Sequence, residues 1–562
     1  MSSTKTEKAL EGMGSICSDH GVGFRVWAPN ADQVGIVGDF QNWDHEKPLT
    51  LKAEEAGYWY GFSNEAAPGD EYKIQIINGQ NRFTRLDPYA RKITHSDGNS
   101  IVYDPASFSW DDDSFELPPL TDLVIYECHL GTFAGNFETA AGKLKYLKTM
   151  GFNVIELMPV TDFPGDRSWG YNPAHIFSVE TNYGGVEGLK AFVKQAHSLG
   201  IGVILDVVYN HLGPDDLDLW DFDGSATDGT GGPYFYPDER AQTPWGDTRP
   251  NYSYEPVRRY LRDNLVMWLE EYNIDGIRTD GTVYVRRMDV GSDDLPHGWT
   301  LLQWLSDEVR DSNRWRVMIA EDLQNDEWLT RPTEDNGAGF HSQWDANFCH
   351  PVREMLAASS DSDRSAQKLA EILSFCYNGD PFQSVIYTES HDEVANGSAR
   401  MVSEIDPGDP EGEYAVKRAL LGIAIVLTSP GVPMLFQGQV RMADGWFSDD
   451  DFINWGAEGR DRESLRICRD FLRLRSGADD RAPELRTGEL QIILCDEEQG
   501  LLITRRGGSD LSVILNLHNK VQTLSIGEGF SVYAATGDVA VEGSTLTVSP
   551  YAALCCRGEL NT

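Results

Sequence analysis

Over its first hundred residues the chain alternates apolar and polar positions in short stretches that are separated by turn residues. A period of two predicts β-strands, here at residues 22–28, 34–40, 57–62 and 72–77, and a turn at 29–32. Short strands with turns so close together predict a small β-sandwich that ends near residue 105.

From residue 122 the pattern changes to apolar runs that alternate with helical periodicity. Strands are predicted at 123–129 and 154–159, helices at 143–151 and 185–197, and a further strand starts at Val203. Strands that are apolar throughout and separated by helices indicate an α/β architecture with a parallel sheet.

Beyond about residue 480 the short alternating pattern returns, which predicts a second β-sandwich at the C-terminal end. A chain of 562 residues is too long for a single hydrophobic core, so several domains are expected. We therefore predict an N-terminal β-sandwich over residues 1–110, an α/β domain over 111–478 and a C-terminal β domain over 479–562.

Within the α/β region, acidic residues stand where short apolar segments end. The segments Ile-Asp-Gly-Ile-Arg-Thr-Asp, Met-Ile-Ala-Glu-Asp and Glu-Ser-His-Asp-Glu contain Asp280, Glu321 and Asp392. An apolar run upstream leads in the same way to Asp206 and, beyond it, His211. Because the carboxyl ends of parallel strands meet at one face of a barrel, these side chains are expected to share one site.

In this order, the four segments resemble the α-amylase superfamily, glycoside hydrolase family 13. The resemblance covers roughly residues 120–475 and implies a (β/α)8 TIM barrel with a β-sandwich on either side. The N-terminal stretch Phe-Arg-Val-Trp-Ala-Pro is similar to the carbohydrate-binding type of domain in branching enzymes and isoamylases. Trp27, Trp43 and Trp59 of that part either stack on sugar rings or fill the sandwich core and the domain interface.

The resemblance also implies the chemistry. Asp280 is the expected nucleophile, Glu321 the general acid/base and Asp392 the third carboxylate, which binds sugar hydroxyls. A retaining glycosidase needs the first two groups about 5–5.5 Å apart and forms a covalent glycosyl-enzyme. Glu321 must hold its proton near neutral pH, and its apolar neighbours Met318 and Ile319 agree with a raised pKa.

Substrate contacts are implied for aromatic, histidine and charged residues around these carboxylates. His391 and His211 would donate hydrogen bonds to the sugar at the cleavage point, and Tyr171 would form an aromatic platform beneath it. Asp206 is expected to orient Arg278 rather than to react. The full expected set is Trp169, Tyr171, Asp206, His211, Arg278 and His391.

Some positions depart from the family pattern. Thr279 stands where an aromatic or aliphatic residue is usual, and Gly281 where alanine is common. Asn210 matches a calcium ligand of many amylases, but branching-type relatives often lack the metal, so we expect neither a metal nor another cofactor. After Met-Leu-Phe-Gln-Gly-Gln, the usual glutamate and aromatic residue are replaced by Val440 and Arg441.

Two activities within the family compete. The Ser-His-Asp-Glu-Val and Ile-Ala-Glu-Asp segments and Gly281 resemble 1,4-α-glucan branching enzymes, and branching is the expected activity. The stretches Asp-Val-Val-Tyr-Asn-His-Leu-Gly-Pro and Gln-Trp-Asp-Ala-Asn-Phe are closer to maltooligosyltrehalose trehalohydrolases, so that activity and other amylase-type hydrolysis stay open. A glucan-binding protein without catalysis would have lost a reacting carboxylate, and all three are present.

The composition of the chain limits the classes of partner that it is expected to bind. With 89 acidic and 47 basic residues, a net charge of −42 argues against nucleic acid and anionic membranes, whereas a neutral α-glucan such as glycogen is compatible. No apolar run reaches the length of a membrane span, and the N-terminus lacks a secretory pattern, so a cytoplasmic monomer or weak oligomer is expected. The 8 cysteines are scattered and contain no Cys-x-x-Cys motif, so reduced thiols are expected.

The charge of −42 also predicts that stability rises with salt. Going from about 0.01 M to about 1 M ionic strength shortens the Debye length from about 30 Å to about 3 Å, which relieves repulsion between surface carboxylates. The melting temperature should therefore increase along a KCl series. A flat or falling melting temperature would contradict the hypothesis that the acidic surface is an adaptation to high salt.

Overall fold

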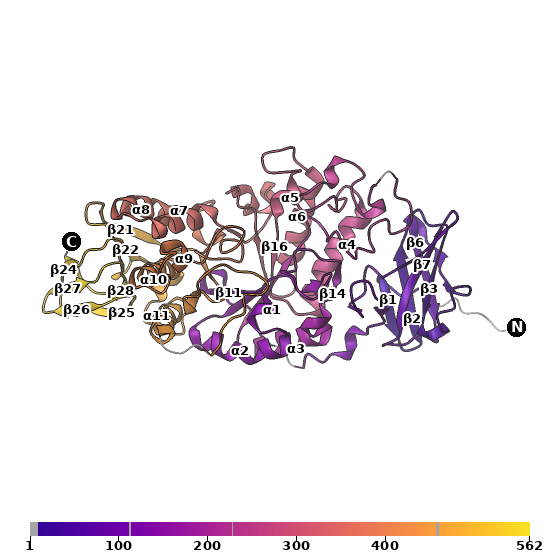
Figure 1. Cartoon of the computed structure of the whole chain (residues 1–562), viewed down its shortest axis with the longest axis horizontal. Coiled ribbons are helices and arrows are strands. Elements are labelled where there is room, and N and C mark those ends of the chain that lie inside the picture. Colours follow the sequence, from indigo (N-terminus) through magenta and orange to yellow (C-terminus); the bar gives the residue numbers. More distant parts are fainter. Residues whose placement is uncertain (1–8, 112–113, 228, 457–459, 562) are drawn as a thin grey trace.

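Three parts follow one another along the long axis of the molecule (Figure 1). The computed structural model describes residues 9–111, 114–227, 229–456 and 460–561. An N-terminal pair of sheets, a closed eight-stranded parallel barrel and a C-terminal pair of sheets confirm the predicted fold class. Residues 1–8, for which the sequence analysis found no secretory pattern, and the acidic residues Asp112 and Asp113 fall outside the described residues. The predicted domain bounds remain a prediction.

The N-terminal part consists of two antiparallel sheets. One has the order β1-β2-β6-β5, and the other has β4-β3-β7-β10-β9 with β8 paired to β7. The two sheets pack against each other, so Phe24 and Ile36 lie in one core with Tyr72 and Ile74. The strands are β1 (Gly14–Ser18), β2 (Gly21–Trp27), β3 (Gln33–Gly38), β4 (Leu49–Thr50), β5 (Lys52–Ala53), β6 (Tyr58–Ser63), β7 (Glu71–Asn78), β8 (Asn81–Arg85), β9 (Lys92–Ile93) and β10 (Ser100–Ile101).

Two of the three N-terminal tryptophans, Trp27 and Trp59, serve in packing, whereas the indole N–H of Trp43 donates to the Asp39 carboxylate at 2.8 Å. Trp27 is 3% exposed and lies edge-on to the rings of Tyr234 and Tyr254, which belong to the loop that follows the third barrel strand. Trp59 is partly buried, and its indole N–H donates to the Ala28 carbonyl at 3.0 Å. For Trp27 the sugar-stacking alternative is therefore wrong, because the ring is enclosed at the interface with the barrel.

The barrel strands pair in parallel, in the order β11-β12-β15-β16-β17-β18-β19-β20, and β20 closes on β11. A short antiparallel pair, β13 (Thr161–Asp162) and β14 (His175–Val179), lies beside it. Every barrel strand is fully buried, as expected for a sheet covered by helices. The barrel strands are β11 (Ile125–Cys128), β12 (Val154–Leu157), β15 (Gly202–Val207), β16 (Gly276–Thr279), β17 (Val317–Ala320), β18 (Ser342–Trp344), β19 (Ser384–Ile386) and β20 (Val432–Phe436).

Helices occupy most of the connections between barrel strands. α2 begins at Phe137, six residues before the predicted start at 143, because the Asn136 side chain caps the helix by accepting from the Thr139 N–H at 2.9 Å. Between β17 and β18 the chain forms two 3-10 turns, η9 (Glu327–Leu329) and η10 (Thr333–Asp335). The α-helices are α1 (Leu130–Phe133), α2 (Phe137–Met150), α3 (Gly185–Ser198), α4 (Glu255–Val266), α5 (Thr282–Arg286), α6 (Pro296–Arg310), α7 (Ala346–Ala357), α8 (Ala366–Ser374), α9 (Met401–Ile405), α10 (Glu413–Thr428) and α11 (Arg460–Arg475).

The C-terminal sheets have the orders β21-β22-β23-β28-β25 and β26-β27-β24-β29. Buried arginines attach them to the barrel: the Arg364 guanidinium donates to the Leu517 carbonyl at 3.1 Å, and Arg506 donates to the Thr428 carbonyl. The strands are β21 (Leu490–Asp496), β22 (Leu501–Arg506), β23 (Leu511–Asn516), β24 (Gln522–Ile526), β25 (Ser531–Ala535), β26 (Val539–Glu542), β27 (Thr545–Val548), β28 (Ala553–Arg557) and β29 (Leu560–Asn561).

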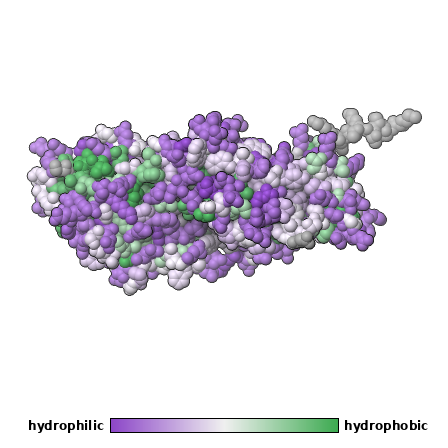
Figure 2. Space-filling model, turned by 90° about the horizontal axis from the view of Figure 1, so that it is seen from above, coloured by the Kyte–Doolittle hydropathy of each residue, from purple (hydrophilic) through white to green (hydrophobic). Residues whose placement is uncertain are grey.

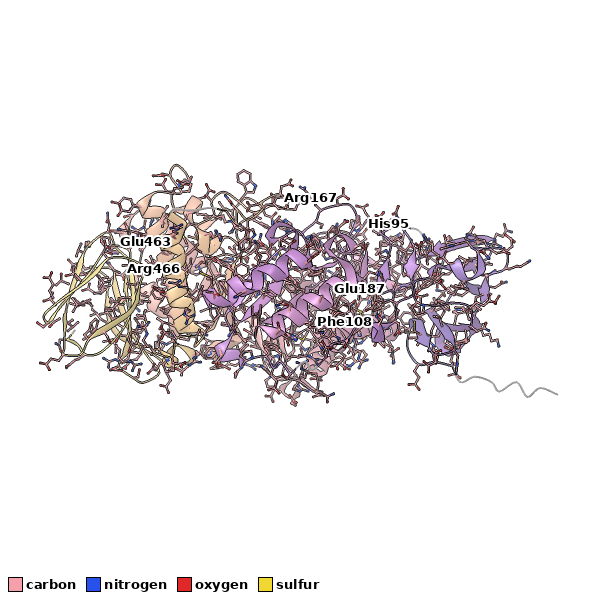
Figure 3. All side chains as sticks on the ribbon, turned by 90° about the horizontal axis from the view of Figure 1, so that it is seen from below. His95, Phe108, Arg167, Glu187, Glu463 and Arg466 are labelled. Carbon is pink, nitrogen blue, oxygen red and sulfur yellow. The ribbon has the colours of Figure 1, made fainter. Side chains whose placement is uncertain are left out.

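The outer surface carries mostly polar side chains. The face shown in Figure 2 is largely hydrophilic, and its apolar residues gather near the end that holds the C-terminal sheets. Charged residues such as Glu187 on α3 and Glu463 on α11 stand on the face shown in Figure 3, where Glu187 pairs with Lys92 of β9 at 2.9 Å. All eight cysteines are free thiols, as predicted. Among the described residues, no helix is both long and apolar enough to cross a bilayer.

Candidate active site

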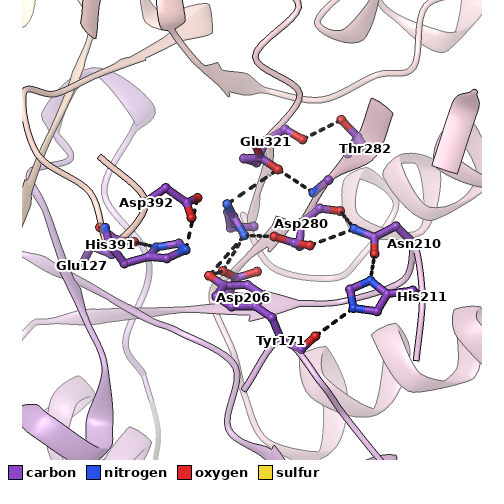
Figure 4. A network of polar contacts seen from close by, with 12 residues as sticks. Glu127, Tyr171, Asp206, Asn210, His211, Asp280, Thr282, Glu321, His391 and Asp392 are labelled. Atoms are coloured by element: carbon purple, nitrogen blue, oxygen red, sulfur yellow. Dashed lines mark hydrogen bonds and ion pairs between the residues drawn. The ribbon is translucent and has the colours of Figure 1, made fainter. Parts of the chain in front are cut away.

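A polar cluster at the carboxyl ends of the barrel strands includes Asp206, Asp280 and Glu321 (Figure 4). Arg278 on β16 is completely buried, and its Nη1 lies 2.6 Å from Asp206 Oδ2 and 2.8 Å from Asp280 Oδ1. Its Nη2 lies 3.8 Å from Glu321 Oε2. Three carboxylates from β15, β16 and β17 thus surround one guanidinium. This gathering is what parallel strands in register produce when each carries an acidic residue at its end.

Asp280 follows β16 directly and accepts hydrogen bonds at both carboxylate oxygens. Oδ1 receives the Arg278 bond, and Oδ2 receives one from Asn210 Nδ2 at 2.8 Å. The same amide nitrogen donates to the Asp280 carbonyl at 2.9 Å. Asn210 therefore uses its amide to hold Asp280 in place, a role that the resemblance to a calcium ligand did not suggest.

The backbone conformation and contacts of Gly281 explain why glycine stands where alanine is usual. It has φ +48°, in the left-handed region, and its N–H donates to Glu321 Oε2 at 2.6 Å. A Cβ at this position would stand 2.3 Å from Asn210 Nδ2, the group that holds Asp280. Glycine therefore allows the backbone to approach Asn210 and to join Asp280 to Glu321 through one N–H group.

Glu321 follows β17 and lies in the enclosed part of the cleft. Burial, together with the charges of Asp280 and Asp392, raises the pKa of its carboxyl to about 8 against the lowering effect of Arg278. At neutral pH the protonated form therefore predominates, as a general acid requires. Its neighbour Asp322 is buried and pairs with Arg286 at 2.8 Å, so the two adjacent acids face different partners.

Asp392 and His391 approach from the opposite wall. His391 Nδ1 lies 2.5 Å from Glu127 Oε1 on β11, and His391 Nε2 lies 3.3 Å from Asp392 Oδ2. Burial lowers the pKa of His391, but the carboxylates of Asp392 and Glu127 outweigh burial and raise it to about 9. The ring is therefore an imidazolium at neutral pH that donates from both nitrogens. The Asp392 side chain, 42% exposed, is the most open of the three predicted catalytic carboxylates.

Aromatic rings build the walls of the cleft, which has a volume of about 400 Å³. Tyr171 stacks on His391 with ring centroids 5.0 Å apart, and its hydroxyl donates to Asp206 at 2.6 Å. His211 Nε2 lies 2.8 Å from the Tyr171 carbonyl oxygen. Burial lowers the pKa of His211, which favours the neutral ring. The structure thus brings together all nine residues that the sequence singled out for catalysis and substrate contact.

Several residues of the site escaped the sequence analysis. Trp245 stacks on His211 at 4.5 Å and lines the cleft, and Trp344 packs against Arg278, whose guanidinium carbon lies 4.3 Å from the ring centroid. Glu127, which holds His391, offered one indication: it is a charged residue inside an otherwise apolar strand. Trp245 comes from the Gly-rich aromatic loop 212–255, in which no single ring stands out by pattern.

After β20 the chain turns its variant residues away from the cleft. Val440 is buried, and the Arg441 guanidinium packs on the ring of Trp455, 5.2 Å from its centroid. Phe447 instead stacks on Trp169 at 5.2 Å, next to the cleft. The aromatic ring beside the cleft in this region therefore comes from further along the chain.

Comparisons with known proteins agree with this geometry. Residues 89–226 match the family model described as alpha amylase, catalytic domain, and residues 12–90 match carbohydrate-binding module 48, the isoamylase N-terminal domain. In the part of the chain that the structure describes, no three His, Cys, Asp or Glu side chains form a group suited to a metal ion.

Relatives with curated names extend the match. A 1,4-alpha-glucan branching enzyme GlgB from Cellvibrio japonicus is 32% identical over 454 residues, 75% of this chain and 59% of that enzyme. A malto-oligosyltrehalose trehalohydrolase from Saccharolobus solfataricus is 30% identical over 490 residues, 80% of each chain. The pullulanase of Anoxybacillus sp. LM18-11, solved with maltotetraose, shares the fold with a TM-score of 0.79 at 21% identity, over 98% of this chain and 88% of that one. The chain therefore belongs to the α-amylase family of enzymes.

Proposed function

We propose that the protein is a retaining α-glucan enzyme and, within that class, a 1,4-α-glucan branching enzyme. The observation that carries the retaining mechanism is the pairing of Asp280 and Glu321 across Arg278 and the Gly281 N–H. Asp280 accepts two hydrogen bonds from fixed donors, whereas Glu321 keeps its proton at neutral pH. Two carboxyl groups in such different surroundings suit a nucleophile and a general acid.

In the proposed reaction Asp280 attacks the anomeric carbon of an α-1,4-linked glucose while Glu321 protonates the leaving oxygen. The leaving chain departs, and the glucosyl ester on Asp280 remains. Glu321, now ionised, takes the proton of the incoming hydroxyl as that oxygen displaces Asp280. His391 and His211 are the proposed donors to the sugar, and Asp392 is the proposed acceptor from its hydroxyls.

The incoming hydroxyl decides between transfer and hydrolysis. Transfer to a glucan 6-hydroxyl gives a branch, and attack by water gives hydrolysis. Because water is present in large excess, a transferase must bind its acceptor and exclude solvent. Branching is supported by the Ser-His-Asp-Glu-Val segment around Asp392, by Gly281 and by the branching enzymes among the relatives.

A second candidate is trehalose release from maltooligosyltrehalose. It is supported by the trehalohydrolase relative, whose match covers 80% of both chains. Both activities start from the same covalent step on Asp280, so the stereochemistry of the product does not separate them. The acceptor of the glycosyl group and the end of the substrate that is released do separate the two activities.

Product analysis tests the choice. If the enzyme branches, incubation with amylose should create α-1,6 linkages with little new reducing sugar, and isoamylase should then release short linear chains. The iodine absorbance should fall, because long helical chains are cut and reattached. Trehalose released from maltooligosyltrehalose, with amylose left intact, would favour the second candidate. Reducing ends that rise in step with the iodine loss would mean plain hydrolysis.

Replacing Asp280 with asparagine should lower kcat on any glucan by about 10³-fold or more, because the amide keeps the shape but is a poor nucleophile. The melting temperature, measured in parallel, should stay close to that of the wild type. A variant that keeps activity within about tenfold of the wild type would exclude Asp280 as the nucleophile.

Glu321→Gln should abolish turnover of natural glucans but spare the first step on an α-glycosyl fluoride, whose leaving group needs no proton. In the wild type, kcat/KM on glucans should fall above pH 8, because Glu321 then loses the proton it must donate. In the Glu321→Gln variant, the rate of the first step on the fluoride should show no such decrease above pH 8. Equal losses on natural and activated substrates would show that Glu321 is not the acid.

A further inference from the structure

A second groove lies outside the catalytic cleft, between the first turn of α6 and the segment that connects β17 to β18. Its volume is about 410 Å³, within the usual range for ligand sites. Its walls include two tryptophans, Trp299 and Trp328, and the polar side chains Arg287, Asp294 and Asn336. None of these residues lines the catalytic cleft.

Both rings are held in place, and Trp328 faces solvent whereas Trp299 is partly buried. Trp328 is 42% exposed, and the Arg331 guanidinium carbon lies 4.1 Å from its ring centroid. Arg331 is itself fixed by a 3.0 Å hydrogen bond to Asn378. The indole N–H of Trp299 donates to the Asn336 carbonyl at 3.3 Å. Exposed aromatic surface that is already ordered costs little entropy when a ligand covers it.

The polar groups of the groove suit a neutral polyhydroxyl ligand. Arg287 Nε lies 3.0 Å from Asp294 Oδ1, and the Asp294 side chain is 74% exposed, so this planar pair still offers donors and acceptors to solvent. Aromatic faces beside such groups match a sugar, whose C–H face is apolar and whose edge carries hydroxyls. The charge of −42 makes an anionic ligand unfavourable.

One arginine connects the groove to the catalytic cleft. Arg286 lines the groove, and its guanidinium binds Asp326 at 3.0 Å on one side and Asp322 at 2.8 Å on the other. Asp322 directly follows Glu321 and lines the catalytic cleft. A ligand in the groove would therefore lie on the Glu321 side of the cleft, one layer of side chains away from the reacting groups.

We propose that this groove is a second α-glucan site, with Trp328 as its aromatic platform, which holds a chain on the acid/base side of the cleft. The identity of the ligand rests on the proposed function, because the acceptor of a transferase enters on the side of the general base. A chain bound to Trp328 is kept near the cleft, so its effective concentration there rises.

Native electrophoresis of the intact protein in gels that contain glycogen tests the proposal, because it measures binding and not product formation. Trp328→Ala should weaken retardation, with an apparent dissociation constant for glycogen about three- to tenfold higher, because one ring contact is lost. Trp328→Phe should keep most of the affinity, since it keeps an aromatic face. Its melting temperature and that of Trp328→Ala should match the wild type, because the side chain is exposed.

Trp315→Ala is the matched control. Trp315 is 43% exposed but precedes β17 at the opposite end of the barrel, so its loss should leave retardation unchanged. The proposal that the groove binds glucan would be overturned if the wild type and Trp328→Ala were retarded equally. It would also be overturned if Trp328→Ala and Trp315→Ala weakened retardation to the same extent. Either result leaves the linkage analysis of the amylose product untouched, so failure of the groove and failure of branching are separate outcomes.

Discussion

The site depends on one buried cation. The Arg278 guanidinium is enclosed in the barrel and is the counter-ion for Asp206 and Asp280, with Glu321 close by. Removing one member of such a buried group typically costs about 3–5 kcal/mol, because the remaining charge stays desolvated and unpaired. The barrel holds these groups in fixed positions, because the strands that carry them are hydrogen-bonded in register.

The same cation separates the roles of two otherwise similar carboxyl groups. Nη1 contacts Asp280 at hydrogen-bond distance, while Nη2 stays 3.8 Å from Glu321. For Glu321, burial is the largest effect and, with the charges of Asp280 and Asp392, it outweighs the lowering effect of Arg278, so the pKa of its carboxyl rises to about 8. Gly281 completes the arrangement, because only a residue without Cβ lets Asn210 hold Asp280 while the N–H of position 281 reaches Glu321.

The sequence predicted what is local and missed what the fold brings together. Asp280 and Glu321 follow buried apolar strands, so their position at the barrel mouth follows from neighbouring residues alone. Glu127 and His391 are 264 residues apart, and their contact exists only because β11 and β19 both flank β20 in the closed barrel. Trp245 lies in a long loop whose path depends on packing against His211 and Tyr284 rather than on any period. Trp27 was ambiguous for the same reason, since its partners Tyr234 and Tyr254 belong to that loop.

The placement of Trp27 also bears on how this enzyme would hold a polymer. An N-terminal module whose best-buried tryptophan is locked against the barrel cannot use that ring to bind glucan. On the barrel, by contrast, Trp328 is both exposed and ordered, so it offers aromatic surface to a long chain. Arg286 joins that groove to Asp322, which is the neighbour of Glu321. A chain held in the groove would therefore lie close to Glu321, the group proposed to deprotonate the acceptor. If the groove holds an acceptor chain, the outer wall of the barrel contributes, with the catalytic carboxylates, to the choice between a glucan acceptor and water.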